Sequence, residues 1–256
     1  SPIEKHKTGF LKKFLILQMR PETEACESEL NAILRYGRLT NEEVHRIRVE
    51  QDNIEDIDID NYAAIIAGGS PFDISIPEEK KSSVQKKVEV FFNSLFDKII
   101  PWDFPFLGAC SGNGLLGRYC GASITDKYAE PLRSVEVWVT EEGAKDPLLK
   151  DLPKKFTALV GHKEACDTVP PGAVLLVSSD PCPVQMFRIK KNIYATQFHP
   201  EADADEFILR IRIYKNAGYF RPEEAEELST AIRESNTPVP KEILRRFVDR
   251  YRSEKK

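Results

Sequence analysis

The sequence Phe-Pro-Phe-Leu-Gly-Ala-Cys-Ser-Gly-Asn-Gly-Leu-Leu-Gly, which runs from Phe104 to Gly117, decides the fold. An apolar run leads into Gly108, Cys110 follows, and a helical segment comes next at 115–119. Because Gly108 and Gly112 carry no Cβ atoms, they allow a tight turn between a strand and a helix. We expect this turn to hold Cys110 above a sheet at the N-terminus of the helix, where the helix dipole favours the thiolate. The pattern therefore predicts that Cys110 is a catalytic nucleophile.

The first half of the chain alternates apolar strands with helices. The elements expected here are strands at 14–18, 44–49, 62–67 and 104–107 and helices at 22–36 and 83–100. The helix at 83–100 has the clearest apolar face, which includes Val84, and Pro101 is expected to end it. The continuous apolar strands indicate a parallel sheet that helices cover on both faces.

The second half of the chain has a different pattern, with short alternating strands separated by Pro and Gly. Strands are expected at 132–140, 156–160, 173–178, 184–189 and 193–197, followed by a helix at 204–216. The close spacing of the first four of these strands predicts an antiparallel section. The tail at 221–256 is predicted to form two helices, with the apolar stripe of the second packed on its own domain or on a neighbouring subunit.

Composition limits the function classes. The 256 residues are 41% hydrophobic and 30% charged, with a net charge of −4, which is typical of a globular protein and gives no basic excess for nucleic acid. No apolar run reaches the ~20 residues that cross a bilayer, and the polar N-terminus has no signal-peptide core. The five cysteines are odd in number and irregularly spaced, so they predict neither a disulfide framework nor a zinc site. We therefore expect a cytoplasmic protein without a metal or a membrane partner.

A cysteine nucleophile needs a base, and the chain has four histidines. His199 is the best candidate because it ends the last predicted strand, in the sequence Gln-Phe-His-Pro-Glu at 197–201. Glu201 lies two residues on, where its carboxylate can fix the imidazole tautomer and stabilise the imidazolium. The ends of strands converge at one edge of a parallel sheet, so Cys110 and His199 can meet there. The other candidates are weaker, since His6 lies in the polar N-terminus and His45 lies among exposed charges.

Three motifs together resemble the class I (triad-type) glutamine amidotransferase family. They are Gly-Ala-Cys-Ser-Gly at 108–112, Gln-Phe-His-Pro-Glu at 197–201, and the apolar strand that ends in Gly-Gly at 68–69. The resemblance covers about residues 14 to 216. It implies an open, mostly parallel, flavodoxin-like α/β sheet and a domain at 1–220, with a helical extension at 221–256. It also implies that the glutamine side-chain amide is hydrolysed through a γ-glutamyl thioester, which releases ammonia without a cofactor.

The resemblance carries roles onto individual residues. Cys110 matches the nucleophile, His199 the base and Glu201 the carboxylate that orients it. Gly69, with the backbone N–H of Ser111, matches the oxyanion hole. The positions that match the substrate side are Gly68, Asn113, Gly114 and His162.

One position departs from the family pattern. The nucleophile motif usually continues Gly-x-Cys-x-Gly-x-Gln, and Gly114 stands in place of the Gln that helps to bind glutamine. The substrate is therefore glutamine, or with the same triad a γ-glutamyl compound or small peptide. A non-catalytic regulatory or binding module is the alternative from another class. We expect no attached synthetase domain, so any ammonia-accepting synthetase would be a separate protein. A homo-oligomer is also possible.

Overall fold

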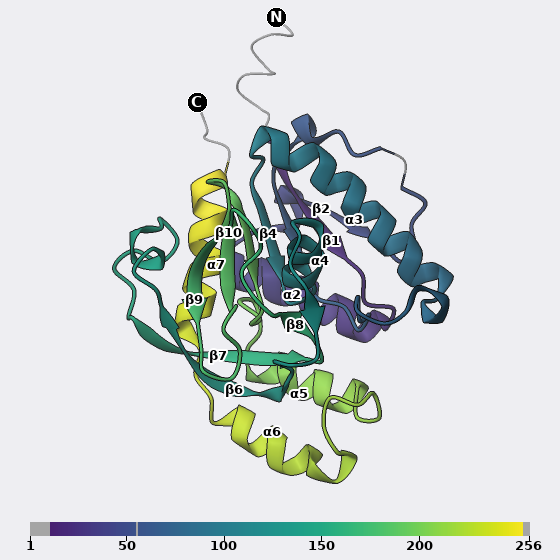
Figure 1. Ribbon diagram of the computed structural model, residues 1–256, viewed down its shortest axis with the longest axis vertical. Helices are drawn as coiled ribbons and strands as arrows, with labels where there is room; N and C mark the ends of the chain where they lie inside the picture. The colour runs from purple at the N-terminus through teal and green to yellow at the C-terminus, as the bar shows by residue number, and fades with distance from the viewer. Residues whose placement is uncertain (1–10, 55, 253–256) are drawn as a thin grey trace, which may run out of the picture.

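The computed structural model describes residues 11–54 and 56–252 and has a nine-stranded mixed sheet with helices on both faces (Figure 1). The strand order is β2-β1-β3-β4-β11-β10-β9-β6-β7. This confirms the predicted flavodoxin-like α/β fold with an antiparallel section and C-terminal helices. The polar N-terminus, with His6, lies outside the described residues.

One half of the sheet is parallel, and it carries the nucleophile motif. Its strands are β2 (Val44–Arg48), β1 (Lys13–Gln18), β3 (Tyr62–Ala67), β4 (Phe106–Ala109) and β11 (Ile193–Thr196). The strands β4 and β11 pair in register from Phe106 and Ile193 to Ala109 and Thr196, and both are fully buried. The segments that follow these two strands therefore emerge side by side at one edge of the sheet.

The other half of the sheet is antiparallel. It contains β10 (Met186–Ile189), β9 (Val174–Ser178), β6 (Glu130–Val139) and β7 (Lys155–His162). The short strands β5 (Ile124–Thr125) and β8 (Ala165–Cys166) form a separate two-stranded sheet. This half brings the end of β7 close to the end of β4, since the Cys110 thiol lies 3.7 Å from the carbonyl oxygen of Gly161.

The side chains of β1 alternate between two cores, as expected for a strand that is covered on both faces. Leu15 and Leu17 pack in the core with α3 (Ser83–Trp102) and α4 (Ser111–Tyr119). Phe14 and Ile16 pack in the core with α2 (Thr23–Gly37) and α7 (Pro238–Tyr251). A third, smaller core joins α5 (Ala204–Ile213) and α6 (Ala225–Arg233) to β6 and β7.

Two details of α3 were predicted wrongly. Pro101 lies inside the last turn of the helix, where it removes only one backbone donor, and Asp103 ends the helix in the left-handed conformation with φ 49°. Val84 is 38% exposed, and Gln85 takes the buried place in the first turn. The side-chain amide of Gln85 is satisfied there because it donates to the carbonyl of Asp73 at 2.7 Å.

The tail forms the two predicted helices and packs on its own domain. The apolar stripe of α7 is fully buried at Ile243 and Phe247, in the same core as β1. The boundary at residue 220 stays a prediction. Within 11–54 and 56–252, no helix combines the length and the apolar composition that crossing a membrane requires.

Candidate active site

Cys110 occupies the tight turn that the sequence predicts. It lies between β4 and α4 with φ 52° and ψ −87°, a conformation that side-chain-bearing residues rarely adopt. Its N–H donates to the carbonyl of Thr196, at the end of β11, over 2.7 Å. A Cβ on Gly108 would lie 2.8 Å from the Cα of Gly112, so the turn excludes side chains at Gly108. The helix begins directly at Ser111, earlier than the sequence predicts.

The ionisation state of Cys110 differs from the sequence-based expectation. The side chain is buried, and burial raises the pKa of the Cys110 thiol to about 12, although Arg20 and Arg210 act in the opposite direction. Within 11–54 and 56–252, its sulfur has two weak hydrogen-bond partners, the carbonyl of Gly161 and the side-chain amide of Gln197, each at 3.7 Å. Burial therefore outweighs the helix dipole, and Cys110 rests as a thiol that needs a base.

His199 and Glu201 form a buried pair just beyond β11. The Nδ1 atom of His199 lies 3.1 Å from Oε1 of Glu201, and both side chains are almost fully buried. Burial alone would raise the pKa of Glu201, but His199, Arg210 and Arg20 hold it at about 2. Burial lowers the pKa of His199, Glu201 opposes this effect, and Arg210 and Arg20 add to it. At neutral pH the pair is thus a carboxylate beside a neutral imidazole, which is able to accept a proton.

Arg210 of α5 also belongs to this cluster, and sequence reasoning missed it. Its Nη1 lies 3.1 Å from Nδ1 of His199, and its Nη2 lies 3.9 Å from Glu201 and 3.8 Å from Glu206. A guanidinium can only donate, whereas Glu201 can only accept, so the two compete for one ring nitrogen. The tautomer of His199 depends on which of them prevails. The sequence does carry a signal for a buried Arg210, because it lies next to Ile211 and one turn after Phe207, and these two apolar residues mark the buried face of the helix.

The expected oxyanion-hole donors differ in how free they are. The N–H of Gly69 donates to Glu29 over 3.2 Å, and Glu29 in turn accepts from Arg20 at 2.9 Å. A Cβ on Gly69 would lie 3.2 Å from Cε1 of His199, so this glycine faces the imidazole ring. Ser111 is the first residue of α4, and N–H groups in the first turn of a helix lack intrahelical acceptors. Gly69 can therefore stabilise an oxyanion only after its N–H leaves Glu29.

A small cavity of about 30 Å³ adjoins Cys110 and contains two of the four predicted substrate-side residues. Gly114 and His162 line it. Asn113 is fully buried and points elsewhere, since its side chain accepts from the thiol of Cys166 at 3.3 Å. Gly68 packs against Glu29, where a Cβ would lie 2.1 Å from the carboxylate. Gly68 and Asn113 do not line this cavity, and their role in substrate binding stays a prediction.

His162 has hydrogen-bond partners on both ring nitrogens. Nδ1 lies 2.9 Å from the carbonyl of Glu164, and Nε2 lies 2.8 Å from Glu130. Both ring nitrogens of His162 are therefore engaged within the fold. Glu130, His162 and Cys182 are close enough to hold a metal ion, but Glu130 already accepts from His162 and from the amide of Gln185 at 2.9 Å. The arrangement fits a structural hydrogen-bond network better than a metal centre.

The family model described as Glutamine amidotransferase class-I matches residues 24–211. The chain belongs to the class-I glutamine amidotransferase family. Its relatives include a subunit of the glutamine-hydrolyzing GMP synthase of Methanococcus maripaludis, 34% identical over 41% of this chain and 54% of the relative. The protein of the same name from Methanocaldococcus jannaschii is 36% identical over 40% of this chain and 54% of the relative. The chain thus spans about half the length of the curated relatives it matches.

Solved structures show the same fold. A glutamine amidotransferase from Thermotoga maritima superposes with a TM-score of 0.73 at 20% identity and covers 94% of this chain and 98% of that chain. A glutamine amidotransferase from Methylobacillus flagellatus gives a TM-score of 0.72 at 16% identity, with 96% of this chain and 97% of that chain covered. At these identities the likeness concerns the fold alone.

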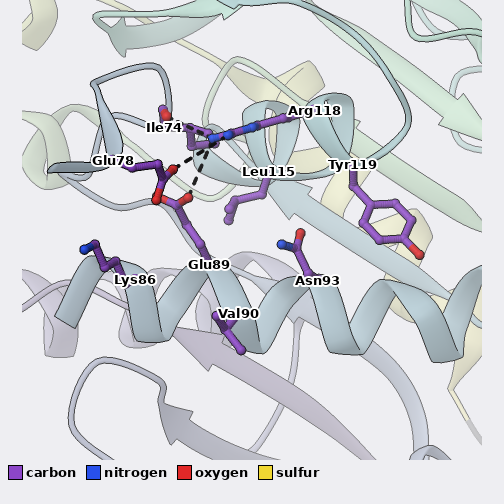
Figure 2. A pocket seen from close by; sticks show the side chains of 9 residues that line it. All are labelled: Ile74, Glu78, Lys86, Glu89, Val90, Asn93, Leu115, Arg118 and Tyr119. Atoms are coloured by element: carbon purple, nitrogen blue, oxygen red, sulfur yellow. Dashed lines mark hydrogen bonds and ion pairs between the residues drawn. The ribbon is translucent and has the colours of Figure 1, made fainter. Parts of the chain in front are cut away.

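Within this class-I glutamine amidotransferase fold, Ile74 fills the space beside Gly114. A Cβ on Gly114 would lie 3.0 Å from Cδ1 of Ile74 and 3.9 Å from the carboxylate of Glu164. The backbone of Ile74 is held on both sides, because its N–H donates to Glu164 at 2.7 Å and its carbonyl accepts from Arg118 at 3.0 Å. Arg118 is placed by ion pairs with Glu78 and Glu89 in an open pocket between α3 and α4 (Figure 2). Ile74 therefore stands where the side chain of a Gln at 114 would begin.

Proposed function

We propose that Cys110, His199 and Glu201 hydrolyse the side-chain amide of glutamine and release ammonia. Nε2 of His199 takes the thiol proton, and the Cys110 thiolate attacks the amide carbon. The imidazolium returns the proton to the nitrogen as the carbon–nitrogen bond breaks. Water, deprotonated by the same imidazole, then cleaves the γ-glutamyl thioester and frees glutamate and the thiol. Glu201 keeps the proton of His199 on Nδ1 throughout.

The observation that carries this proposal is the pairing of strand ends. The strained Cys110 follows β4, and the His199–Glu201 pair follows the adjacent parallel strand β11. Preorganised N–H donors for the oxyanion lower such barriers by about 3–4 kcal/mol each. We assign the N–H of Ser111 to this role, with Gly69 as a second donor once Glu29 releases it.

Steady-state ammonia release tests the proposal. The wild type is expected to release ammonia from glutamine, and Cys110→Ala is expected to lose this activity while keeping its melting temperature within a few degrees. Activity that survives in Cys110→Ala would assign the chemistry to another group. If neither the wild type nor Cys110→Ala releases ammonia, and Cys110→Ala leaves the biological activity unchanged, the chain is a non-catalytic regulatory or binding module.

Gly114 favours a second candidate substrate. Ile74 occupies the place of the usual Gln side chain. The site therefore lacks the contact that this Gln makes with glutamine, and an apolar side chain lines it instead. Hydrolysis of a γ-glutamyl compound or small peptide by the same residues fits this difference. Comparison of kcat/KM for glutamine and for γ-glutamyl dipeptides separates the two, since the better substrate has the higher value.

We also infer a separate synthetase chain that accepts the ammonia, because the archaeal relatives are named as subunits of GMP synthase. All five cysteines are unpaired, which supports a reducing, cytoplasmic setting. Addition of a candidate synthetase and its substrates is expected to raise glutamine hydrolysis. Unchanged hydrolysis with every candidate would argue for a stand-alone hydrolase.

A further inference from the structure

The cavity beside Cys110 has a charged rim that the proposed triad does not use. Asp73 comes from the loop after β3, and Lys163 directly follows β7. Their charged atoms, Oδ2 and Nζ, lie 3.9 Å apart, and the two side chains are 27% and 36% exposed. A negative and a positive group thus stand together at the opening of the nucleophile's cavity.

The backbone around Asp73 is held in place by several side chains. Its carbonyl accepts from Gln85, and the next residue, Ile74, is bound by Glu164 and Arg118. These bonds fix the loop against α3, α4 and the end of β7. Asp73 therefore presents its carboxylate to the cavity from a preorganised position, which is what a recognition group requires.

Lys163 is held more loosely. Its ammonium lies 4.6 Å from the ring centroid of Tyr219, which also lines the cavity. Among the described residues, its only ion pair is the long one with Asp73, which is too long for a hydrogen bond. Both charges keep their hydrogen-bonding capacity for another partner.

The cavity is too small for a substrate as it stands. Its volume of about 30 Å³ has room for only a few water molecules. An amino acid can reach Cys110 only if a group at the rim moves, and the long side chain of Lys163, which is 36% exposed and has no hydrogen bond to Asp73, is able to do so. A zwitterionic ligand can separate Lys163 from Asp73 without leaving either charge unpaired, whereas a neutral ligand cannot.

We propose that Asp73 binds the α-ammonium of the substrate and Lys163 binds its α-carboxylate. The inference rests on the proposed function of Cys110 and adds the residues that recognise the amino-acid end of the substrate. The site selects a γ-amide whose other end is a free amino acid, such as glutamine or a γ-glutamyl compound, and rejects a glutamine residue inside a peptide. Asp73 and Lys163 thus take over the substrate recognition of the family's usual Gln, which this chain lacks because position 114 is Gly.

The test uses three γ-amides that differ only at the recognised end. Glutamine has both charges, glutaramate lacks the α-ammonium, and 4-aminobutanamide lacks the α-carboxylate. Asp73→Asn is expected to lower kcat/KM for glutamine at least tenfold and to leave glutaramate within about threefold, because a lost charge-assisted contact affects only substrates that make it. Lys163→Met is likewise expected to lower kcat/KM for glutamine at least tenfold. It should leave kcat/KM for 4-aminobutanamide within about threefold, because that substrate has no carboxylate for Lys163 to bind.

Matched controls come from Glu142 and Lys145, an exposed pair on a remote turn. Glu142→Gln and Lys145→Met change the net charge as the test variants do, and they are expected to leave all three substrates unchanged. Equal losses on all three substrates in Asp73→Asn and Lys163→Met, or no losses, overturn the inference. If hydrolysis depends on Cys110 in that same experiment, the proposed function stands without it.

A binding measurement tests the inference even if the enzyme does not hydrolyse glutamine without a partner. With Cys110→Ala, millimolar glutamine is expected to raise the melting temperature, and added Asp73→Asn is expected to abolish this rise. An equal rise in the double variant overturns the inference. No rise in Cys110→Ala, together with no ammonia release by the wild type, refutes both this inference and the proposed function.

Discussion

Replacement of Glu201 by Gln tests the electrostatics of the buried cluster most sharply. In the wild type, Nδ1 of His199 lies 3.1 Å from both Glu201 and Arg210. A carboxylate at 201 requires the proton on Nδ1, which leaves Nε2 free to take the thiol proton. Once Glu201 is neutral, Arg210 donates to Nδ1, and the proton moves to Nε2. His199 then cannot act as the base.

Two magnitudes follow from this change. The same substitution in a Ser-His-Asp triad lowers kcat about 10⁴-fold, and we expect a loss of about 10³–10⁴-fold here. Removal of one partner from a buried ion pair costs about 3–5 kcal/mol, because Arg210 keeps its charge without Glu201. For a chain of this size that loss lowers the melting temperature by about 6–20 °C. The assays are ammonia release at saturating glutamine and thermal unfolding.

Glu206→Gln is the matched control. Glu206 also lies within 3.8 Å of Arg210, but among the contacts in the described part of the chain it has none with His199. We expect it to destabilise the protein while kcat stays within tenfold of the wild type. A Glu201→Gln enzyme with more than a tenth of wild-type kcat would refute the tautomer argument. Equal activity losses in the two variants would reduce the role of Glu201 to fold stability.

Three further predictions concern stability and reactivity. The pKa of Glu201 is about 2 in the fold, below its ordinary value of 4.5, so its stabilising effect is complete above pH 4.5 and disappears toward pH 2. The unfolding free energies of the wild type and Glu201→Gln, measured by urea titration, should therefore converge as the pH falls over that range. Gly114→Gln is expected to lower the free energy of unfolding by about 1–3 kcal/mol, because the new side chain would press on Ile74. Adding Ile74→Ala to this variant should restore part of that loss. An unchanged stability of Gly114→Gln would contradict the contact. Phe247→Ala, which empties a fully buried site in α7, is expected to cost about 3–5 kcal/mol, and a loss below about 1 kcal/mol would show that α7 is not docked.

The sequence predicts the fold and the positions of Cys110 and His199 well, for a physical reason. Continuous apolar runs identify buried parallel strands, and glycines flank the one turn where the backbone of Cys110 is strained. The ends of β4 and β11 then have to meet at one edge of the sheet. Local patterns of this kind depend on neighbouring residues, so a single sequence reveals them.

The ionisation and the surroundings of these residues are not visible in the sequence. Arg210 and Glu29 come from helices far from Cys110 in the chain, and only the packing of α5 and α2 places them at the site. Burial, which depends on the whole fold, raises the pKa of the thiol that the helix dipole alone would lower. The charged rim likewise joins two distant loops, which bring Asp73 to Lys163.

Covalent labelling with a diazo-ketone analogue of glutamine tests the central claim most directly. The analogue needs a thiol that a neighbouring base can deprotonate, so it reports the chemistry of Cys110 without any ammonia acceptor. We predict a single adduct on Cys110 by peptide mass spectrometry, slowed by glutamine and lost in His199→Asn. An adduct on any of the other four cysteines, or none in the wild type, would contradict a Cys110–His199–Glu201 site.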